Sequence, residues 1–437
     1  MFTILGSGLN TLFSMRRPTI SVSTLIAQLV AFPLGNFWAR YMPKRKFRTF
    51  GIEWELNPGP FTVKEHTLIT IMSNVSFGVA YATDIIIAQE VFYKQHFGYI
   101  YQICLTLTTQ MLGYGIAGVC RRWLVYPAAM IWPALLATTT FLNTLHNRRN
   151  PIADGWTISR YRFFIYIMIG AFIWYFVPGF IFPALSTFAF VTWMFPHNVV
   201  VNQLFGMTSG MALLPITFDW SQITGYLGSP LTTPWFAAGN IVIGLVVWIW
   251  IVCPVLHFGN VWEGLYFPFS SYEALFGDVD FRSVSYDNTQ QQYDVSKILT
   301  PEVTLDEAAY KNYSPLFLST TFGFSYALCF GSLTAVLMHT ACFHHREILS
   351  RFKASKEKDD IHMQLYRKYP EVPDRWYFIL FGLMMVMSII VCETWDTRLP
   401  WWGFLVTQLI PFVFTLPIGI VQAITNVQIG MRSSDRN

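Results

Sequence analysis

Long apolar runs recur along nearly the whole chain, and several have the length of a membrane-spanning helix. A helix that crosses a bilayer needs about 20 mostly apolar residues, and the runs at 66–93, 97–120, 235–258 and 401–425 satisfy this requirement. The 437 residues are 53% hydrophobic and only 12% charged, which leaves too little polar surface for a water-soluble body. The sequence therefore predicts a polytopic membrane protein and excludes a disordered chain, a coiled coil and an ordinary soluble enzyme.

Counting the apolar runs gives ten spans and one interrupted region. The other spans are predicted at 1–14 (partial), 18–41, 122–145, 160–183, 315–342 and 376–393. Residues 185–233 are interrupted by Pro, Gly, Asn and Asp, a pattern typical of broken helices that line a solute path, although two short spans joined by an ordinary loop also fit it. Backbone groups in lipid must be paired internally, so the spans must be helices. The predicted fold is all-α: one transmembrane domain over 1–437 with about 10–12 membrane segments and a broken or re-entrant region.

The charged loops indicate the orientation of the spans. Residues 42–49 are basic, and residues 343–375 carry eight basic against six acidic residues, so both are predicted to be cytoplasmic. Residues 259–313 carry nine acidic against three basic residues and are predicted to be an extracellular loop. The loop at 146–162 does not follow this charge rule, because it carries four Arg but is predicted to lie on the extracellular side.

Several classes of function lack support. Lys and Arg are spread between the apolar runs rather than gathered on one basic face, which argues against nucleic-acid binding. The six cysteines show no CxxC spacing, so neither a disulfide framework nor a metal site is indicated, and no cofactor is expected. Gly113-Tyr-Gly115-Ile-Ala-Gly118 spells a dinucleotide motif but ends an apolar run, so we interpret it as close helix packing. HExxH, P-loop and GxSxG motifs are missing, and no enzyme is predicted.

The segment from Asn57 to His66 is the most informative part of the chain. Its two prolines around Gly59 favour a rigid turn, and Pro60 suits the first positions of a helix. If 66–93 is one continuous helix, polar residues form a stripe along one of its faces. That stripe contains His66, Thr70, Ser73, Asn74, Tyr81 and Asp84.

The stripe has two interpretations. Thr70, Ser73 and Asn74 either line a path or hold neighbouring helices together, as such residues commonly do. A carboxylate near the middle of a bilayer costs about 2.5–3.5 kcal/mol, so Asp84 is predicted to have a role in ion or solute transfer. Glu65 and His66 are either anchors at the membrane surface or groups that handle protons.

Other polar residues are candidates for the same path. Asp219 is the predicted functional residue of the interrupted region, and Gln110 and Tyr114 of the span at 97–120 either face the path or simply pack.

The chain resembles the oligopeptide transporter family of fungi and plants. The segment N-P-G-P-F-x-x-K-E-H at 57–66 closely matches that family's signature, and T-Q-M-L-G-Y-G-I-A-G at 109–118, N-T-L-H at 143–146 and L-P-I-G-I at 416–420 extend the resemblance over 1–431. It implies proton-coupled uptake of small peptides, in some members glutathione, through the plasma membrane, with an internal membrane such as the vacuole as the alternative. Small peptides, protons and the lipid bilayer are the implied partners.

By position, the resemblance implies functional roles for Asn57, Pro58, Gly59, Lys64, Glu65 and His66. We predict proton coupling by Glu65, His66 and Asp84. The predicted substrate path is Asn57, Pro58, Gly59, Lys64, Asn74, Tyr81, Gln110, Tyr114 and Asp219. The alternatives are a metal-chelate transporter of the same superfamily and a transport-inactive remnant. We also expect the chain to be partial, since family members have a complete first span and a K-I-P-P-R segment near the end.

Overall fold

The computed structural model is mostly helical and describes most of the chain. The described residues are 2–16, 21–147, 152, 155–207, 210–227, 229–270, 285–301, 303–346, 348, 361–366, 368–395 and 397–430. Parts of the predicted loops at 259–313 and 343–375 therefore lie outside the described residues.

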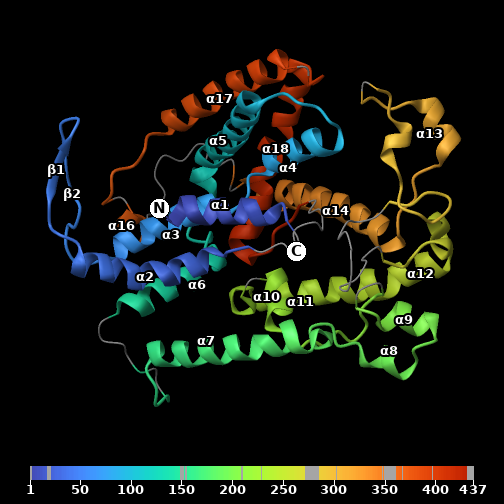
Figure 1. Ribbon diagram of the computed structural model, residues 1–437, viewed down its shortest axis with the longest axis horizontal. Helices are drawn as coiled ribbons and strands as arrows, with labels where there is room; N and C mark the ends of the chain where they lie inside the picture. The colour runs from blue at the N-terminus through green and yellow to red at the C-terminus, as the bar shows by residue number, and fades with distance from the viewer. Residues whose placement is uncertain are drawn as a thin grey trace. The chain divides into compact units, whose positions relative to one another are not determined.

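Figure 1 shows the order of the helices, of which the long ones follow the apolar runs of the sequence. In the first part of the chain these are α1 (Phe2–Ser14), α2 (Thr24–Tyr41), α3 (Val63–Phe77), α4 (Tyr81–Ile87), α5 (Tyr99–Leu124), α6 (Pro133–His146) and α7 (Arg160–Phe176). Short helices α8 (Phe190–Met194), α9 (Val199–Phe205) and α10 (Trp220–Leu227) follow. The rest are α11 (Trp235–Gly244), α12 (Cys253–Phe258), α13 (Glu307–Tyr313), α14 (Thr320–His339), α16 (Ile361–Tyr366), α17 (Asp374–Thr394) and α18 (Trp401–Thr425).

Within the described residues, seven helical segments are long and apolar enough to cross a membrane, and one of them contains the separate helices α3 and α4. They are Val63–Phe92, Tyr99–Leu124, Arg160–Ile181, Trp235–Phe258, Thr320–His344, Asp374–Thr394 and Trp401–Thr425. Several include a π-helical continuation, such as Leu245–Val252 between α11 and α12. These spans confirm the predicted polytopic helical fold. The predicted runs at 1–14, 18–41 and 122–145 correspond to α1, α2 and α6, helices of 13, 18 and 14 residues that do not meet the same criterion.

One predicted span has a different internal structure. The run at 66–93 is interrupted, because α3 ends at Phe77 and α4 begins at Tyr81. Gly78 and Ala80 have extended backbone conformations on either side of the break. Residues on α3 and α4 therefore do not share the face that a continuous helix would give them.

Two short strands also depart from the all-α prediction. β1 (Lys46–Thr49) and β2 (Ile52–Glu55) pair antiparallel as a hairpin between α2 and α3. The sequence of this segment indicates only a basic cluster, and no strand is predicted from it.

The chain folds as two compact units, each assembled from separate stretches of sequence. The first comprises Met1–Gly115, Leu135–Ile169 and Tyr377–Trp401, and the second comprises Ile116–Ala134, Gly170–Trp376 and Trp402–Asn437.

In the first unit, α3 packs against α1 and α2. Glycines allow close approach in this unit: a Cβ on Gly6 would lie 2.2 Å from the ring of Phe77, and one on Gly115 would lie 3.1 Å from Cα of Phe381. The second contact supports close helix packing at Gly115, where α5 and α17 meet, but not at Gly113, where a Cβ would meet nothing within 4 Å.

The second unit has an apolar core around Cys253. Met211, Phe269 and Phe324 are buried with it, and Trp250 and Leu328 pack against the cluster. Among its described residues, the interrupted region contributes short α-helices of 5, 7 and 8 residues, so its irregular sequence corresponds to irregular structure.

Candidate functional site

The turn at Asn57–Pro60 is fastened to the end of α2. Asn57 is almost fully buried, and its side-chain nitrogen donates hydrogen bonds to the carbonyl oxygens of Ala39 (3.0 Å) and Met42 (2.7 Å). Its side-chain oxygen accepts a hydrogen bond from the backbone N–H of Gly59, whose φ of 140° favours glycine. Asn57 and Gly59 thus set the direction in which the chain enters α3.

A capping box then starts α3. The hydroxyl of Thr62 accepts a hydrogen bond from the N–H of Glu65 (3.3 Å), and the Glu65 carboxylate accepts one from the N–H of Thr62 (2.8 Å). This reciprocal pair satisfies two backbone donors at the helix start. Glu65 therefore has a defined structural role, while the neighbouring Lys64 is exposed.

His66, one turn into the helix, faces inward and forms a pair with His146. The side chain of His66 is fully buried. Its Nδ1 lies 2.8 Å from Nε2 of His146, at the end of α6, and its Nε2 lies 2.7 Å from the carbonyl oxygen of Gln28 on α2. Three helices of the first unit, α2, α3 and α6, therefore meet at this histidine pair.

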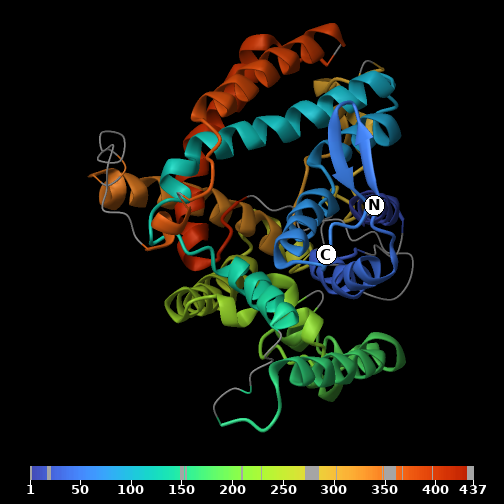
Figure 2. The same ribbon diagram turned by 90° about the vertical axis from the view of Figure 1, so that its left-hand side faces the viewer.

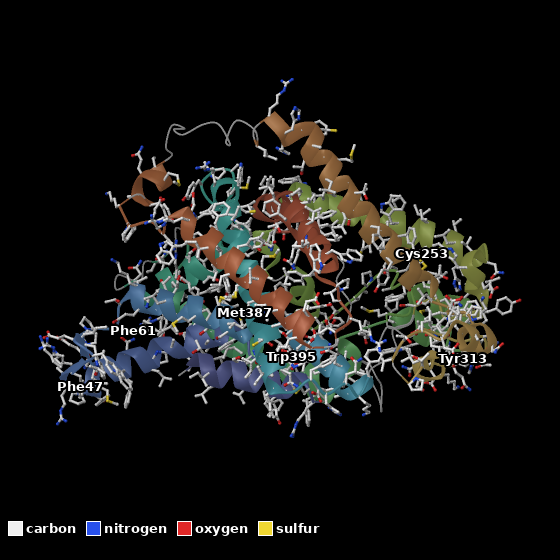
Figure 3. All side chains as sticks on the ribbon, turned by 90° about the horizontal axis from the view of Figure 1, so that it is seen from above. Phe47, Phe61, Cys253, Tyr313, Met387 and Trp395 are labelled. Atoms are coloured by element: carbon white, nitrogen blue, oxygen red, sulfur yellow. The ribbon has the colours of Figure 1, made fainter. Side chains whose placement is uncertain are left out.

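Aromatic rings surround the two imidazoles. The ring centroid of Phe61 lies 5.4 Å from that of His66 and 5.7 Å from that of His146, and Phe32 lies 6.1 Å and 5.0 Å from the same two rings. Phe61 is the aromatic residue of the 57–66 signature and is labelled in Figure 3. These rings give the pair an apolar environment, in which hydrogen bonds are stronger and unpaired charges more costly than in water.

The hydrogen-bond partners define where the protons of the pair lie. A carbonyl oxygen only accepts, so Nε2 of His66 carries a hydrogen and donates it to Gln28. In the neutral pair, Nδ1 of His66 is then the acceptor and Nε2 of His146 the donor. One added proton fits on Nδ1 of His146. A second would place two N–H groups face to face, so the pair holds one excess proton at most.

Two buried polar atoms of the same helices have no hydrogen-bond partner among the described residues. They are Oε1 of Gln28 and Oγ of Ser73. The Gln28 side chain donates to the carbonyl oxygen of Thr138 on α6, so its unpaired oxygen belongs to the same three-helix junction. Buried polar groups are normally paired, so the junction has unused hydrogen-bonding capacity.

The other residues of the predicted stripe do not join this junction. Asn74, Tyr81 and Asp84 are exposed on the surface of the described chain, whereas His66, Thr70 and Ser73 are buried. The break between α3 and α4 explains this for Tyr81 and Asp84, whereas Asn74 lies on α3 itself and is exposed on another face of that helix. Gln110 and Tyr114 are exposed on α5.

Asp219, in the second unit, is buried and well bonded. Its carboxylate accepts hydrogen bonds from the hydroxyl of Ser186 (3.0 Å) and from the N–H of Ser221 (2.9 Å), and the second bond caps the start of α10. This arrangement assigns Asp219 a structural role within the interrupted region.

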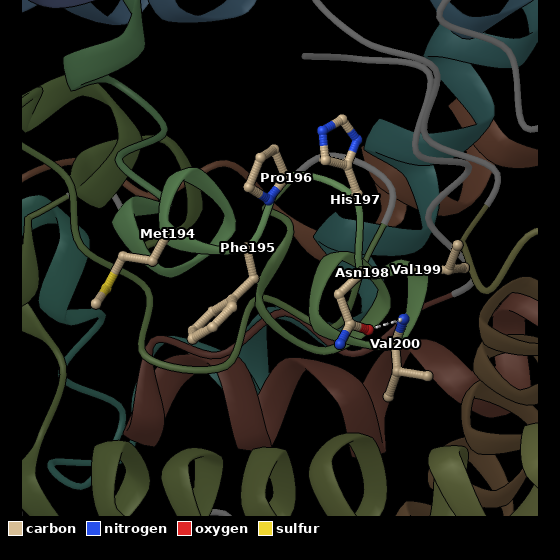
Figure 4. A pocket seen from close by; sticks show the side chains of 7 residues that line it. All are labelled: Met194, Phe195, Pro196, His197, Asn198, Val199 and Val200. Carbon is tan, nitrogen blue, oxygen red and sulfur yellow. Dashed lines mark hydrogen bonds between the residues drawn. The ribbon is translucent and has the colours of Figure 1, made fainter.

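A surface pocket lies in the same region of the second unit. It is lined by consecutive residues, Met194 to Val200, at the turn between α8 and α9 (Figure 4). Asn198 is occupied there as the cap of α9, since its side-chain oxygen accepts hydrogen bonds from the N–H groups of Val200 and Val201. The pocket is a concave turn and brings no distant residues together.

His146 and Gln28 belong to the site but are not predicted from the sequence. In the sequence, the segment 143–146 shows only a resemblance to the family. Its last residue lies 80 positions from His66, and no spacing rule connects the two.

The class of this protein follows from its helical spans, its buried polar junction and its low charge. It is an integral membrane protein with several spans. A family model described as OPT oligopeptide transporter protein matches residues 1–434. The chain belongs to the OPT oligopeptide transporter family, which confirms the predicted resemblance and places the chain in a family of membrane transporters rather than of enzymes.

Curated relatives of this chain occur in two yeasts and in the plant Arabidopsis thaliana. The chain is 46% identical over 433 residues to the sexual differentiation process protein isp4 of Schizosaccharomyces pombe, covering 99% of this chain and 54% of the relative. It is 41% identical to glutathione transporter 1 of the same yeast and 39% identical to oligopeptide transporter 1 of Saccharomyces cerevisiae, covering 99% of this chain and 50% and 53% of those relatives. The chain thus spans about half the length of these relatives. No solved structure matches the chain.

Proposed function

We propose that this chain takes part in proton-coupled transport of short peptides across the plasma membrane, with His66 and His146 sharing the coupling proton. The observation that carries the proposal is the buried histidine pair at the junction of α2, α3 and α6. Histidine is the side chain whose ordinary pKa lies nearest physiological pH, so a pair of histidines suits reversible proton loading.

The proton moves along the pair by exchange of hydrogen bonds. A proton arriving at Nδ1 of His146 gives a cation whose Nε2–H already points at His66. Transfer of that bridging hydrogen to Nδ1 of His66 moves the charge inward without moving either ring. The carbonyl oxygen of Gln28 then stabilises the His66 cation through the existing hydrogen bond from Nε2.

Short peptides, including glutathione, are the proposed substrates. The names of the relatives in the two yeasts support this class of solute. Glu65 and Asp84 remain predictions as further proton-coupling groups. Asn57, Pro58, Gly59, Lys64, Asn74, Tyr81, Gln110, Tyr114 and Asp219 remain predictions for the substrate path.

Uptake into proteoliposomes tests the function. The purified chain is reconstituted, an acid-outside pH gradient is imposed, and entry of a labelled tetrapeptide and of labelled glutathione is measured. We expect uptake that requires the gradient, collapses with a protonophore and is inhibited by unlabelled peptide. Competition by a metal chelate but not by peptide would favour the metal-chelate alternative, and no gradient-driven entry of any solute would contradict transport by this chain.

A further inference from the structure

The hairpin between α2 and α3 has two chemically different faces. The strand register pairs Lys46 with Glu55 and Arg48 with Glu53 on one face, and Phe47 with Trp54 and Thr49 with Ile52 on the other. Lys46 and Glu55 form an ion pair of 3.0 Å. The rings of Phe47 and Trp54 stack with centroids 4.7 Å apart, and the Trp54 N–H donates to the Thr49 hydroxyl. A two-stranded hairpin thus has a charged face and an apolar face, both exposed.

The tip of the hairpin presents an aromatic side chain at a conformational cost. Phe50 and Gly51 have φ angles of 51° and 82°, as in a type I′ turn, for which Asn-Gly is the favoured pair. A bulky residue with positive φ is an outlier. The Phe50 side chain is fully exposed and Ile52 is 70% exposed, so folding within the chain does not explain an apolar residue at this strained position.

The root of the hairpin is fixed to the helices beside it. The N–H of Leu56 donates to the carbonyl oxygen of Arg45, the Trp38 indole donates to the carbonyl oxygen of Leu56, and Asn57 binds the last carbonyls of α2. The candidate membrane span that starts at Val63 begins eight positions after the end of β2. Figure 1 shows the hairpin extending from the end of α2, and the side that carries it faces the viewer in Figure 2. Phe47 is labelled on the hairpin in Figure 3.

We propose that this hairpin lies on the membrane surface, with Phe47, Phe50, Ile52 and Trp54 inserted among lipid headgroups of an anionic leaflet. Continuity with a membrane span places the hairpin at the end of that span, where Trp and other aromatic side chains are favoured. Residues 40–55 contain five basic and two acidic residues, which complements anionic lipid. The proposal is independent of the transported solute.

The excess of basic residues near the hairpin also favours lipid over a protein as its partner. The root of the hairpin, where α2 ends and β1 begins, carries Arg40, Lys44 and Arg45. Cations at this level meet lipid phosphates, while the apolar side chains reach the boundary between headgroups and acyl chains. A second copy of the chain would bring the same excess of positive charge against itself.

Photo-crosslinking to lipid tests this placement on the whole chain. The photoreactive amino acid p-benzoylphenylalanine is introduced in place of Phe47 on the apolar face, in place of Phe50 at the tip, or in place of Glu53 on the charged face as the matched control. Each protein is placed in nanodiscs of phosphatidylcholine alone or with phosphatidylglycerol, both carrying an alkyne tag. We expect strong lipid labelling from positions 47 and 50, several-fold weaker labelling from 53, and preference for phosphatidylglycerol.

Two further variants separate anchoring from folding. Phe50→Asn improves the type I′ turn, so it should keep the hairpin folded while lowering lipid labelling from position 47. Lys44→Gln with Arg45→Gln should reduce the preference for phosphatidylglycerol, by up to about five-fold for each charge at low salt, and high salt should reduce it likewise. Equal labelling from 47 and 53, or crosslinks from 47 and 50 to protein instead of lipid, would overturn the proposal.

Discussion

Gly35, on α2, lies against the ring of Phe61, the aromatic residue of the 57–66 signature. A Cβ on Gly35 would lie 2.6 Å from that ring, closer than packed atoms allow. Because Phe61 also contacts both histidines of the pair, displacing its ring disturbs the site. We expect Gly35→Ala to lower the free energy of unfolding by about 1–3 kcal/mol, less the roughly 1 kcal/mol gained in helix propensity. Thermal unfolding in detergent measures this loss.

Gly113, on α5, is the matched control for that change. A Cβ there would meet nothing within 4 Å. Gly113→Ala should therefore raise the free energy of unfolding, by up to about 1 kcal/mol, through helix propensity alone. Equal destabilisation by both substitutions would contradict the assigned contact with Phe61.

The stability of the segment between α12 and α14 should depend on pH because of the carboxylate of Asp287. Its carboxylate accepts hydrogen bonds from the hydroxyl and N–H of Thr289, the N–H of Gln291 and the hydroxyl of Tyr313, and the bond from the Thr289 hydroxyl is the main cause that lowers the pKa of Asp287. A carboxyl whose pKa is lower in the folded than in the unfolded protein stabilises the fold above its ordinary pKa.

That contribution should be lost as the pH falls through the lowered pKa. Hydrogen exchange of residues 285–319, followed from neutral to strongly acidic pH, should show progressive loss of protection in the acidic range. In Asp287→Asn the protection at neutral pH should already be reduced and the acid-dependent loss should be weaker. An unchanged profile in that variant would contradict the role of the carboxylate.

At the scale of elements, substitutions of Glu65 distinguish its role in the cap of α3 from its predicted role in proton coupling. Gln at this position of a capping box can replace Glu. Glu65→Gln should therefore keep the stability of α3, whereas Glu65→Ala should lose about 1 kcal/mol of unfolding free energy, as lost caps do. Circular dichroism during thermal unfolding measures both, and a large loss in Glu65→Gln would contradict the cap. Because the cap survives in Glu65→Gln, any loss of pH-driven uptake in that variant reports a proton-coupling role.

The helices were largely predictable, while two local features were not. The spans at 235–258 and 401–425 end where predicted because apolar runs bounded by polar residues define them. The break at Gly78–Ala80 was missed because the sequence stays apolar through it and contains no proline. The hairpin was missed because its strands are four residues each and its turn is Phe-Gly rather than Asn-Gly.

At the scale of the whole molecule, the chemistry of the site depends on contacts between distant parts of the chain. His66 is predicted from the local sequence, because a titratable residue just inside an apolar helix is unusual. The local sequence does not predict the contacts of His66 with His146 and with the Gln28 carbonyl, which lie 80 and 38 positions away. Asn57 and Glu65 were recognised for the same region, but their contacts with α2 and Thr62 are visible only in the folded chain.

The central claim is that the histidine pair carries the coupling proton, and proton entry measured together with peptide entry tests it most directly. A pH-sensitive dye inside proteoliposomes reports acidification when peptide is added outside. The unmodified chain and His197→Gln, which changes a histidine of the surface pocket, should both acidify the lumen. His146→Gln should keep peptide-for-peptide exchange but abolish peptide-dependent acidification. Undiminished acidification in His146→Gln would contradict the account.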